Sequence, residues 1–162
     1  MVERYSIVDP GPVASLLLEY WRSKCGDRAM PRRSDFDVLD IPPRIWPMLL
    51  LIEVSNNPRR LRYRVVGSAV VAMIGKDWTG RYVDEIALQT PAVTEQTEET
   101  LELGAPTMHV YTYFRDDPEI DQVRRMDFER LLLPFSEDGE TVSHILGANV
   151  SRVLDSDEFE NC

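Results

Sequence analysis

The chain has 162 residues, 43% of them hydrophobic and 28% charged, and a formal net charge of −10 at pH 7. This length suits one domain with its own hydrophobic core. The acidic balance disfavours nucleic acids and anionic membrane surfaces as partners, because both attract clustered Lys and Arg. The longest apolar run, 48–52, is far shorter than the roughly 20 residues that cross a bilayer, and residues 1–5 lack the layout of a signal peptide. We therefore expect a cytoplasmic protein with no membrane partner.

The clearest predicted helix spans residues 12–25, with Pro12 at its first position and Gly26 as its stop. Its apolar residues recur at helical spacing and form one stripe: Val13, Leu16, Leu17, Tyr20 and Trp21. Two interpretations are open for this stripe. The helix packs on the sheet of its own domain, or it docks on a second copy and makes a homodimer. We expect residues 1–11 to be an N-terminal segment, 12–153 the domain and 154–162 an acidic tail.

The middle of the chain alternates short elements with strong turn signals. A short helical turn is expected at 41–47, and strands at 48–54 and 60–66 form a hairpin around the turn 55–58. Short helices follow at 69–74 and 82–86. A longer helix over 90–103 has only a thin apolar edge, so most of it is expected to face water.

Three strands are predicted in the last third, at 107–115, 123–135 and 141–153, and Asp138-Gly139 marks a tight hairpin between the last two. This order predicts an α+β fold. We expect a five-stranded antiparallel sheet, short helices on one face and the N-terminal helix packed on or across the sheet.

Several motifs in this order carry a family resemblance. They include Leu-x-x-Tyr-Trp at 17–21, Pro-Arg-Arg-Ser-Asp-Phe-Asp at 31–37, Gly-Lys-Asp-Trp-Thr-Gly-Arg at 75–81 and Arg-Leu-Leu-Leu-Pro at 130–134. Together they resemble a bacterial PAS subfamily that is often found as a single-domain protein, over residues 13–148. Two positions depart from the pattern: Val38 stands where a proline is expected, and Trp78 where an aliphatic residue is commoner.

The resemblance implies a sensor or a protein-interaction module. PAS domains similar to this one hold a small ligand, or nothing, between the sheet and the short helices, and often pair through an N-terminal helix. It therefore implies a stand-alone signalling module that regulates an unidentified signalling protein and forms a homodimer. Two alternatives stay open: a ligand-free adaptor or dimerisation module, and a small-molecule enzyme that uses the same pocket. The sequence names no cofactor.

Aromatic side chains with polar tips are the best indication of a ligand pocket, because they suit an apolar cavity that needs a few hydrogen bonds. The alternative is a filled core or a dimer face. Together with one aliphatic residue and one histidine they make the candidate pocket: Tyr63, Ile74, Trp78, Tyr82, Tyr111, Tyr113 and His144. For His144, packing in the core is a simpler interpretation than haem ligation.

No catalytic or metal motif is present. The histidines, His109 and His144, lie 35 positions apart, and neither they nor Cys25 and Cys162 have metal-ligand spacing. Cys25 has no neighbouring base that would activate it as a nucleophile. We therefore predict that the protein is not an enzyme.

Arg60, Arg62 and Arg64 form a basic stripe on one predicted strand. Three interpretations are open: an exposed strand surface, salt bridges to the acidic segments, or capture of an anionic ligand with help from Arg32 and Arg33.

Overall fold

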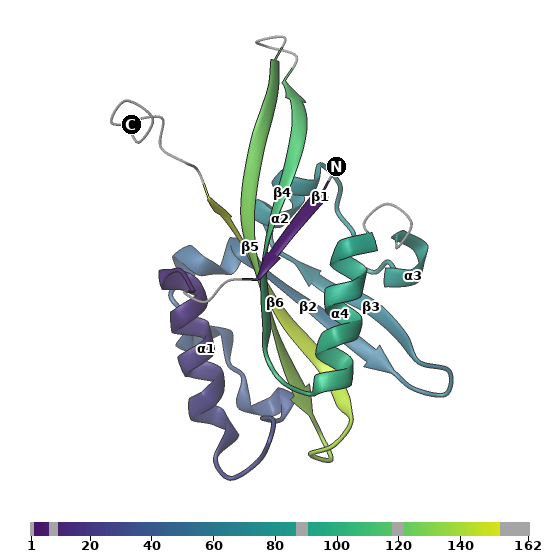
Figure 1. Ribbon diagram of the computed structural model, residues 1–162. Helices are drawn as coiled ribbons and strands as arrows, with labels where there is room; N and C mark the ends of the chain where they lie inside the picture. The colour runs from purple at the N-terminus through teal and green to yellow at the C-terminus, as the bar shows by residue number, and fades with distance from the viewer. Residues whose placement is uncertain (1, 7–9, 87–90, 118–121, 153–162) are drawn as a thin grey trace.

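The computed structural model describes residues 2–6, 10–86, 91–117 and 122–152, and its centre is one sheet in which all neighbouring strands are antiparallel. The strand order is β1-β4-β5-β6-β2-β3 (Figure 1). The strands are β1 (Val2–Ser6), β2 (Leu49–Ser55), β3 (Arg60–Val66), β4 (Thr107–Asp117), β5 (Gln122–Ser136) and β6 (Val142–Arg152). The predicted α+β architecture is confirmed, and each of the five predicted strands is present.

The sheet has one strand more than predicted. β1 lies within the segment 1–11, which the sequence analysis placed before the domain, and it pairs along β4 from Val2↔Tyr113 to Ser6↔His109. An edge strand presents unpaired N–H and C=O groups that accept another strand. The five-residue β1 covers the outer edge of β4. Its sequence carries no strong strand signal of its own.

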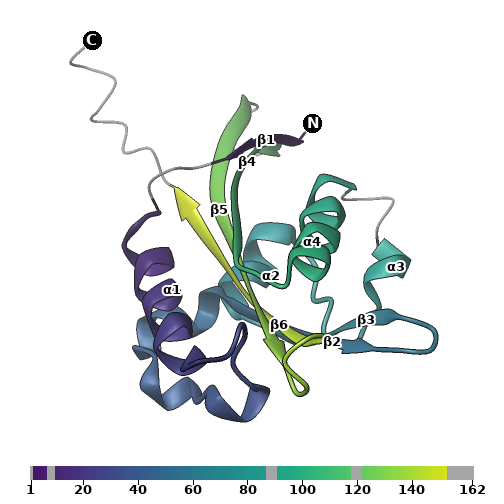
Figure 2. The ribbon, with the colours of Figure 1, turned by 60° about the horizontal axis from the view of Figure 1, so that its bottom comes forward.

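Helices cover both faces of the sheet (Figure 2). α1 (Pro12–Cys25) lies on one side, and α2 (Ser68–Ile74), α3 (Val83–Ile86) and α4 (Pro91–Leu103) lie on the other. Three 3₁₀ helices, η1 (Arg33–Asp35), η2 (Val38–Asp40) and η3 (Pro43–Met48), connect α1 to β2. Among the described helices, none combines the length and apolar character needed to span a membrane.

Successive side chains of β5 point to opposite faces of the sheet, as in any strand. The side chain of Glu129 lies against Gly11 at the start of α1, whereas the side chain of Arg130 bonds to α4. We call these two sides the α1 face and the α4 face. The alternation puts Leu131 and Phe135 on the α1 face and Leu132 on the α4 face, all of them buried.

The apolar stripe of α1 packs on its own sheet. Leu17 and Trp21 are buried, and the indole Nε1 of Trp21 donates a 2.7 Å hydrogen bond to the carbonyl of Pro134 on β5. The remaining stripe residues are only partly buried and lie at the border of the core: Val13, Leu16 and Tyr20. Packing on the domain's own sheet thus accounts for the inner half of the stripe.

Replacing Trp21 by Phe is expected to lower the free energy of unfolding by about 1–3 kcal/mol, because a buried carbonyl loses its donor. Tyr20→Phe is the matched control on the same helix. It removes a 2.8 Å bond from the Tyr20 hydroxyl to Asp40 where both groups reach water, so its effect is expected to be smaller. Urea unfolding of both variants measures the difference. Equal losses would contradict an anchoring role for the indole.

The β5–β6 turn is organised by one carboxylate. Asp138 Oδ1 accepts bonds from the Ser136 hydroxyl and from the backbone N–H groups of Glu140 and Thr141, at 2.7–2.9 Å. The backbone bonds from Thr141 and Glu140, then the Ser136 hydroxyl, lower the pKa of Asp138 to about 2. Because the ordinary pKa is 3.8, this carboxylate stabilises the fold above pH 4, and the contribution disappears as the pH falls from about 4 to about 2.

Asp138→Asn is expected to remove that part of the pH dependence, since the amide oxygen still accepts bonds and does not titrate. Unfolding curves measured between pH 2 and pH 5 check this expectation. A variant whose stability falls as steeply as that of the unmodified protein in this range would contradict it.

Candidate functional site

A charged side chain lies inside the domain, between the sheet and α4. Arg130 is 1% exposed, although it sits in a run of buried leucines on β5. Its Nη1 donates to the carbonyl of Val93 at 3.1 Å, and its two Nη atoms lie 3.3–3.4 Å from the hydroxyl of Thr97. The side-chain oxygen of Gln96 is 3.4 Å from Nη1. All these acceptors are neutral groups of α4.

The buried face of α4 is polar, whereas the sequence analysis expected a thin apolar edge there. Gln96, Thr97 and Thr100 are at most 2% exposed. Gln96 donates to the carbonyl of Arg130 at 3.0 Å and accepts from the Tyr111 hydroxyl at 2.9 Å. The hydroxyls of Thr100 and Thr107 lie 2.7 Å apart. Hydrogen bonds to side chains and backbone of β4 and β5 therefore hold α4 on the sheet.

Burial lowers the pKa of Arg130, and the neighbouring Tyr63 and Tyr111 oppose that shift. No Asp or Glu in the described part of the chain forms an ion pair with this guanidinium. Its Nε has no hydrogen-bond partner, and the same holds for the buried Oδ1 of Asn149. Buried charges are normally paired, and an orphaned buried polar group requires an explanation. This pair of atoms marks the candidate site.

Three of the predicted pocket residues lie around this cluster on the α4 face. Tyr63 is buried, and its ring lies 5.8 Å from that of Trp78, centroid to centroid. Tyr111 is fully buried and stacks on Phe128 at 5.2 Å. Burial raises the pKa of Tyr63, and the nearby Arg130 partly offsets the rise. The phenol groups of Tyr63 and Tyr111 thus provide polar tips beside the guanidinium.

No contact with Arg130 is described for the other four predicted pocket residues. Ile74 is partly buried at the border of the core. The ring of Tyr82 lies at the edge of the sheet and stacks on the guanidinium of Arg60. The side chain of Tyr113 lies outside the described residues. His144 is half-buried on the α1 face, because its pairing with Phe135 and Glu53 puts it on the side of the sheet away from α4. Including His144 in one pocket with Tyr63 was therefore wrong.

Known protein families and solved structures include matches to this chain. A family model described as a PAS domain matches residues 11–150. The chain belongs to the PAS domain family. Among solved structures, an RNA-binding light-oxygen-voltage receptor is similar at 11% sequence identity and a TM-score of 0.43, over 93% of this chain and 38% of the receptor chain. No curated protein matches.

The sequence analysis missed the most unusual member of the candidate site. Arg130 entered the prediction only as part of the Arg-Leu-Leu-Leu-Pro motif, and the predicted site residues did not include Gln96, Thr97 or Asn149. One signal was available: a cation in the middle of a strand whose neighbours are apolar is a buried charge, and such a charge needs a partner. The partners on α4 had no such signal, because Gln and Thr are common on exposed helix faces.

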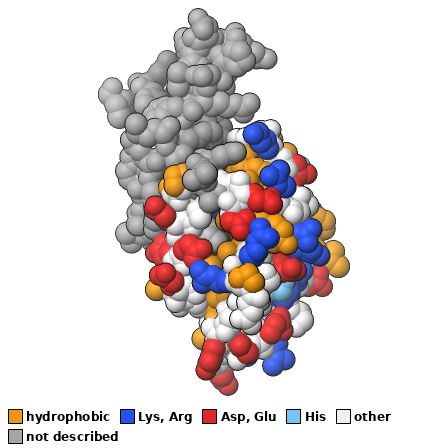
Figure 3. Space-filling view, turned by 90° about the vertical axis from the view of Figure 1, so that its right-hand side faces the viewer, with side chains coloured by type: hydrophobic (Ala, Val, Ile, Leu, Met, Phe, Trp, Pro, Cys, Tyr) orange, Lys and Arg blue, Asp and Glu red, His pale blue; other side chains and the backbone are white. Residues whose placement is uncertain are grey.

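In this PAS domain, the three arginines of the basic stripe are bonded to other residues of the same chain. Arg60 makes two 3.0 Å bonds to Asp84 and stacks on Tyr82, Arg62 donates to the carbonyl of Gly80, and Arg64 lies 3.6 Å from Glu53. Figure 3 shows basic and acidic side chains interspersed over this side of the molecule. The salt-bridge interpretation accounts for Arg60 and Arg64.

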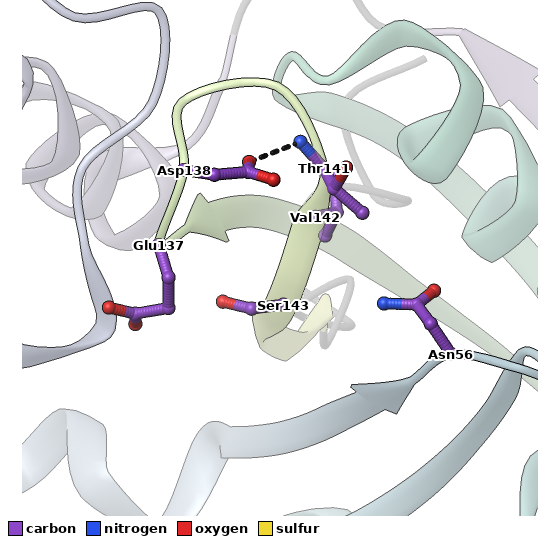
Figure 4. A pocket seen from close by; sticks show the side chains of 6 residues that line it. All are labelled: Asn56, Glu137, Asp138, Thr141, Val142 and Ser143. Carbon is purple, nitrogen blue, oxygen red and sulfur yellow. Dashed lines mark hydrogen bonds between the residues drawn. The ribbon is translucent and has the colours of Figure 1, made fainter.

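A hollow of about 330 Å³ lies at the end of the sheet where the β5–β6 and β2–β3 turns meet. It is lined by Asn56, Glu137, Asp138, Thr141, Val142 and Ser143. Figure 4 shows Asn56 and Glu137 on opposite sides of it, while Asp138 turns toward the backbone of Thr141. The Asp138 carboxylate is already bonded within the β5–β6 turn, so we do not assign a ligand to this hollow.

Metal and thiol chemistry have little support in the described residues. They contain no group of three or more His, Cys, Asp or Glu side chains that could hold a metal ion. Cys25 is buried, and burial raises the pKa of its thiol despite the nearby Arg28. A raised pKa opposes formation of the reactive thiolate.

Arg130→Met is expected to leave the free energy of unfolding unchanged or to raise it by up to about 4 kcal/mol. The acceptors on α4 keep other donors, since Thr97 donates to the Val93 carbonyl and Tyr111 to Gln96. The measurement is urea unfolding of protein refolded from denaturant, so that no bound molecule contributes. Arg64→Met, on the surface, is the control, with little expected change. A clear loss of stability in Arg130→Met alone would contradict this account.

Proposed function

We propose that this PAS domain is a sensory module that binds a small ligand against Arg130, between the sheet and α4, and thereby regulates a partner protein. The observation that carries the proposal is the buried guanidinium, which has an unpartnered Nε and no carboxylate partner among the described residues. The role proposed is not catalytic, and its output is a change in protein association.

The physical reason is the cost of the buried charge. Removing a cation from water without an opposite charge is expensive, and an apolar side chain of similar size in its place is often more stabilising. A group with such an unfavourable environment is a candidate for a functional site. A ligand that satisfies Arg130 would recover part of this cost, and so would bind here more tightly than on the surface.

The strand that carries Arg130 also contacts the helix on the opposite face. Its neighbour Glu129 is buried, and a β-carbon placed on Gly11, the residue before α1, would lie 2.9 Å from the Glu129 carboxylate. A shift of β5 on ligand binding therefore acts on both α4 and the start of α1. For the ligand to regulate a partner, it must bind one arrangement of these helices better than another.

A ligand-free adaptor is the second candidate, and one surface feature favours it. Leu39 of η2 is 75% exposed and Val38 is 38% exposed. They lie beside the outer side of α1, where the hydroxyl of Tyr20 accepts a bond from the backbone of Asp37. We propose this apolar surface and the half-buried residues Val13, Leu16 and Tyr20 as the place where a partner or a second copy docks.

Native mass spectrometry of the freshly purified chain, beside its denatured mass, tests the sensory proposal. We expect a non-covalent mass excess of a small molecule. We also expect that molecule, added back at 100 times its dissociation constant, to stabilise the refolded protein by about 2.7 kcal/mol. Hydrogen exchange should slow in α4 and change in α1. A bare mass, with no stabilisation by a metabolite panel, would contradict the sensor and favour the adaptor.

A further inference from the structure

The two unpartnered atoms of the candidate site lie next to each other in the sheet. Arg130 on β5 is directly paired with Asn149 on β6, so their side chains leave the same face as cross-strand neighbours. Arg130 is 1% exposed and Asn149 6% exposed. The Nε of Arg130 is a donor without an acceptor, and the Oδ1 of Asn149 is an acceptor without a donor. A group that accepts a bond from Nε and donates one to Oδ1 satisfies both.

From this arrangement we infer that the ligand is a small monocarboxylate that carries a hydroxyl group, with the carboxylate on Arg130 and the hydroxyl donating to Asn149. The inference rests on the proposed sensory function and names the chemical class that the site takes.

The charge of the site sets the charge of the ligand. Arg130 contributes one positive charge, and His109, the side chain paired with it across the β4–β5 ladder, already has Glu99 at 2.9 Å. The basic stripe is bound to Asp84, Gly80 and Glu53 at the other edge of the sheet. One carboxylate therefore neutralises the site, whereas a phosphate dianion leaves a buried negative charge, which is costly.

The existing bonds of Arg130 leave room for a stronger acceptor. Its contacts with α4 are 3.1–3.4 Å long, whereas charge-assisted N–H···O⁻ bonds are about 2.7–2.9 Å. The guanidinium has five N–H donors in a planar fork that matches a carboxylate. A carboxylate on Nε and one Nη gives the pair of parallel bonds that the neutral groups of α4 do not provide.

The hydroxyl distinguishes this class from amino acids. A zwitterion also offers a donor to Asn149, but its ammonium group is a second buried cation, and its net charge of zero leaves Arg130 uncompensated. A hydroxyl donates to Oδ1 without adding charge. The aromatic pairs Tyr63–Trp78 and Tyr111–Phe128 provide apolar surface on the same face, which suits a short carbon chain.

The test uses four probes of nearly equal size on the refolded full chain: lactate, propionate, lactamide and alanine. Calorimetry and the shift of the unfolding midpoint report binding. Lactate is expected to bind most tightly, propionate about ten-fold more weakly because it lacks the hydroxyl, and lactamide and alanine at least a hundred-fold more weakly. Inorganic phosphate is expected not to compete with lactate.

Two variants assign the binding to the two atoms. Arg130→Met is expected to abolish lactate binding. Asn149→Leu is expected to remove the preference for lactate over propionate while propionate still binds, so it serves as the matched control. Arg130→Lys, which keeps the charge and loses the fork, is expected to weaken lactate binding at least ten-fold, and it replaces Arg130→Met if that variant does not fold.

The outcomes separate this inference from the proposed function. If lactate does not bind, or binds Arg130→Met as well as the unmodified chain, the inference is wrong. If the molecule retained by the purified chain is neutral or cationic, the sensory function stands and the inference of a hydroxycarboxylate ligand is wrong. If the chain retains no molecule and no member of a metabolite panel stabilises it, both are wrong.

Discussion

One buried positive charge constrains the architecture of this PAS domain. Arg130 lies at 1% exposure in the centre of the sheet, and the elements around it provide neutral hydrogen-bond acceptors in place of a carboxylate. α4 turns Gln96 and Thr97 inward toward the guanidinium. Hydrogen bonds from this inner face hold the helix on the sheet, so a group that competes for Arg130 also acts on the helix.

The alternation of side chains along β5 connects the two faces of the sheet. Glu129 meets the start of α1 and Arg130 meets α4, although the two residues are adjacent in the chain. On the α1 side, Trp21 is bonded to the carbonyl of Pro134 on the same strand. One strand therefore carries the candidate ligand site and the anchor of the N-terminal helix. For the ligand proposed at Arg130, this arrangement gives a physical route to an outer surface.

Much of the fold could be predicted from the sequence, because its signals are local. Pro12 and Gly26 bound α1 where expected, and Asp138-Gly139 lies in the β5–β6 turn. β1 was missed because its place depends on the open edge of β4, which no local pattern reports. His144 was assigned to the wrong face because only the register across β5 and β6 shows which alternate residues face α4. The role of Arg130 depends on partners more than 30 positions away, on α4.

A crystal structure of the full chain as purified, at a resolution that shows ordered water and small molecules, tests the central claim most directly. The account predicts non-protein density between Arg130 Nε and Asn149 Oδ1, with oxygen atoms at hydrogen-bond distance from both. A direct bond between these two side chains, or a protein carboxylate on the guanidinium, would contradict it, because Arg130 would then be a satisfied structural residue.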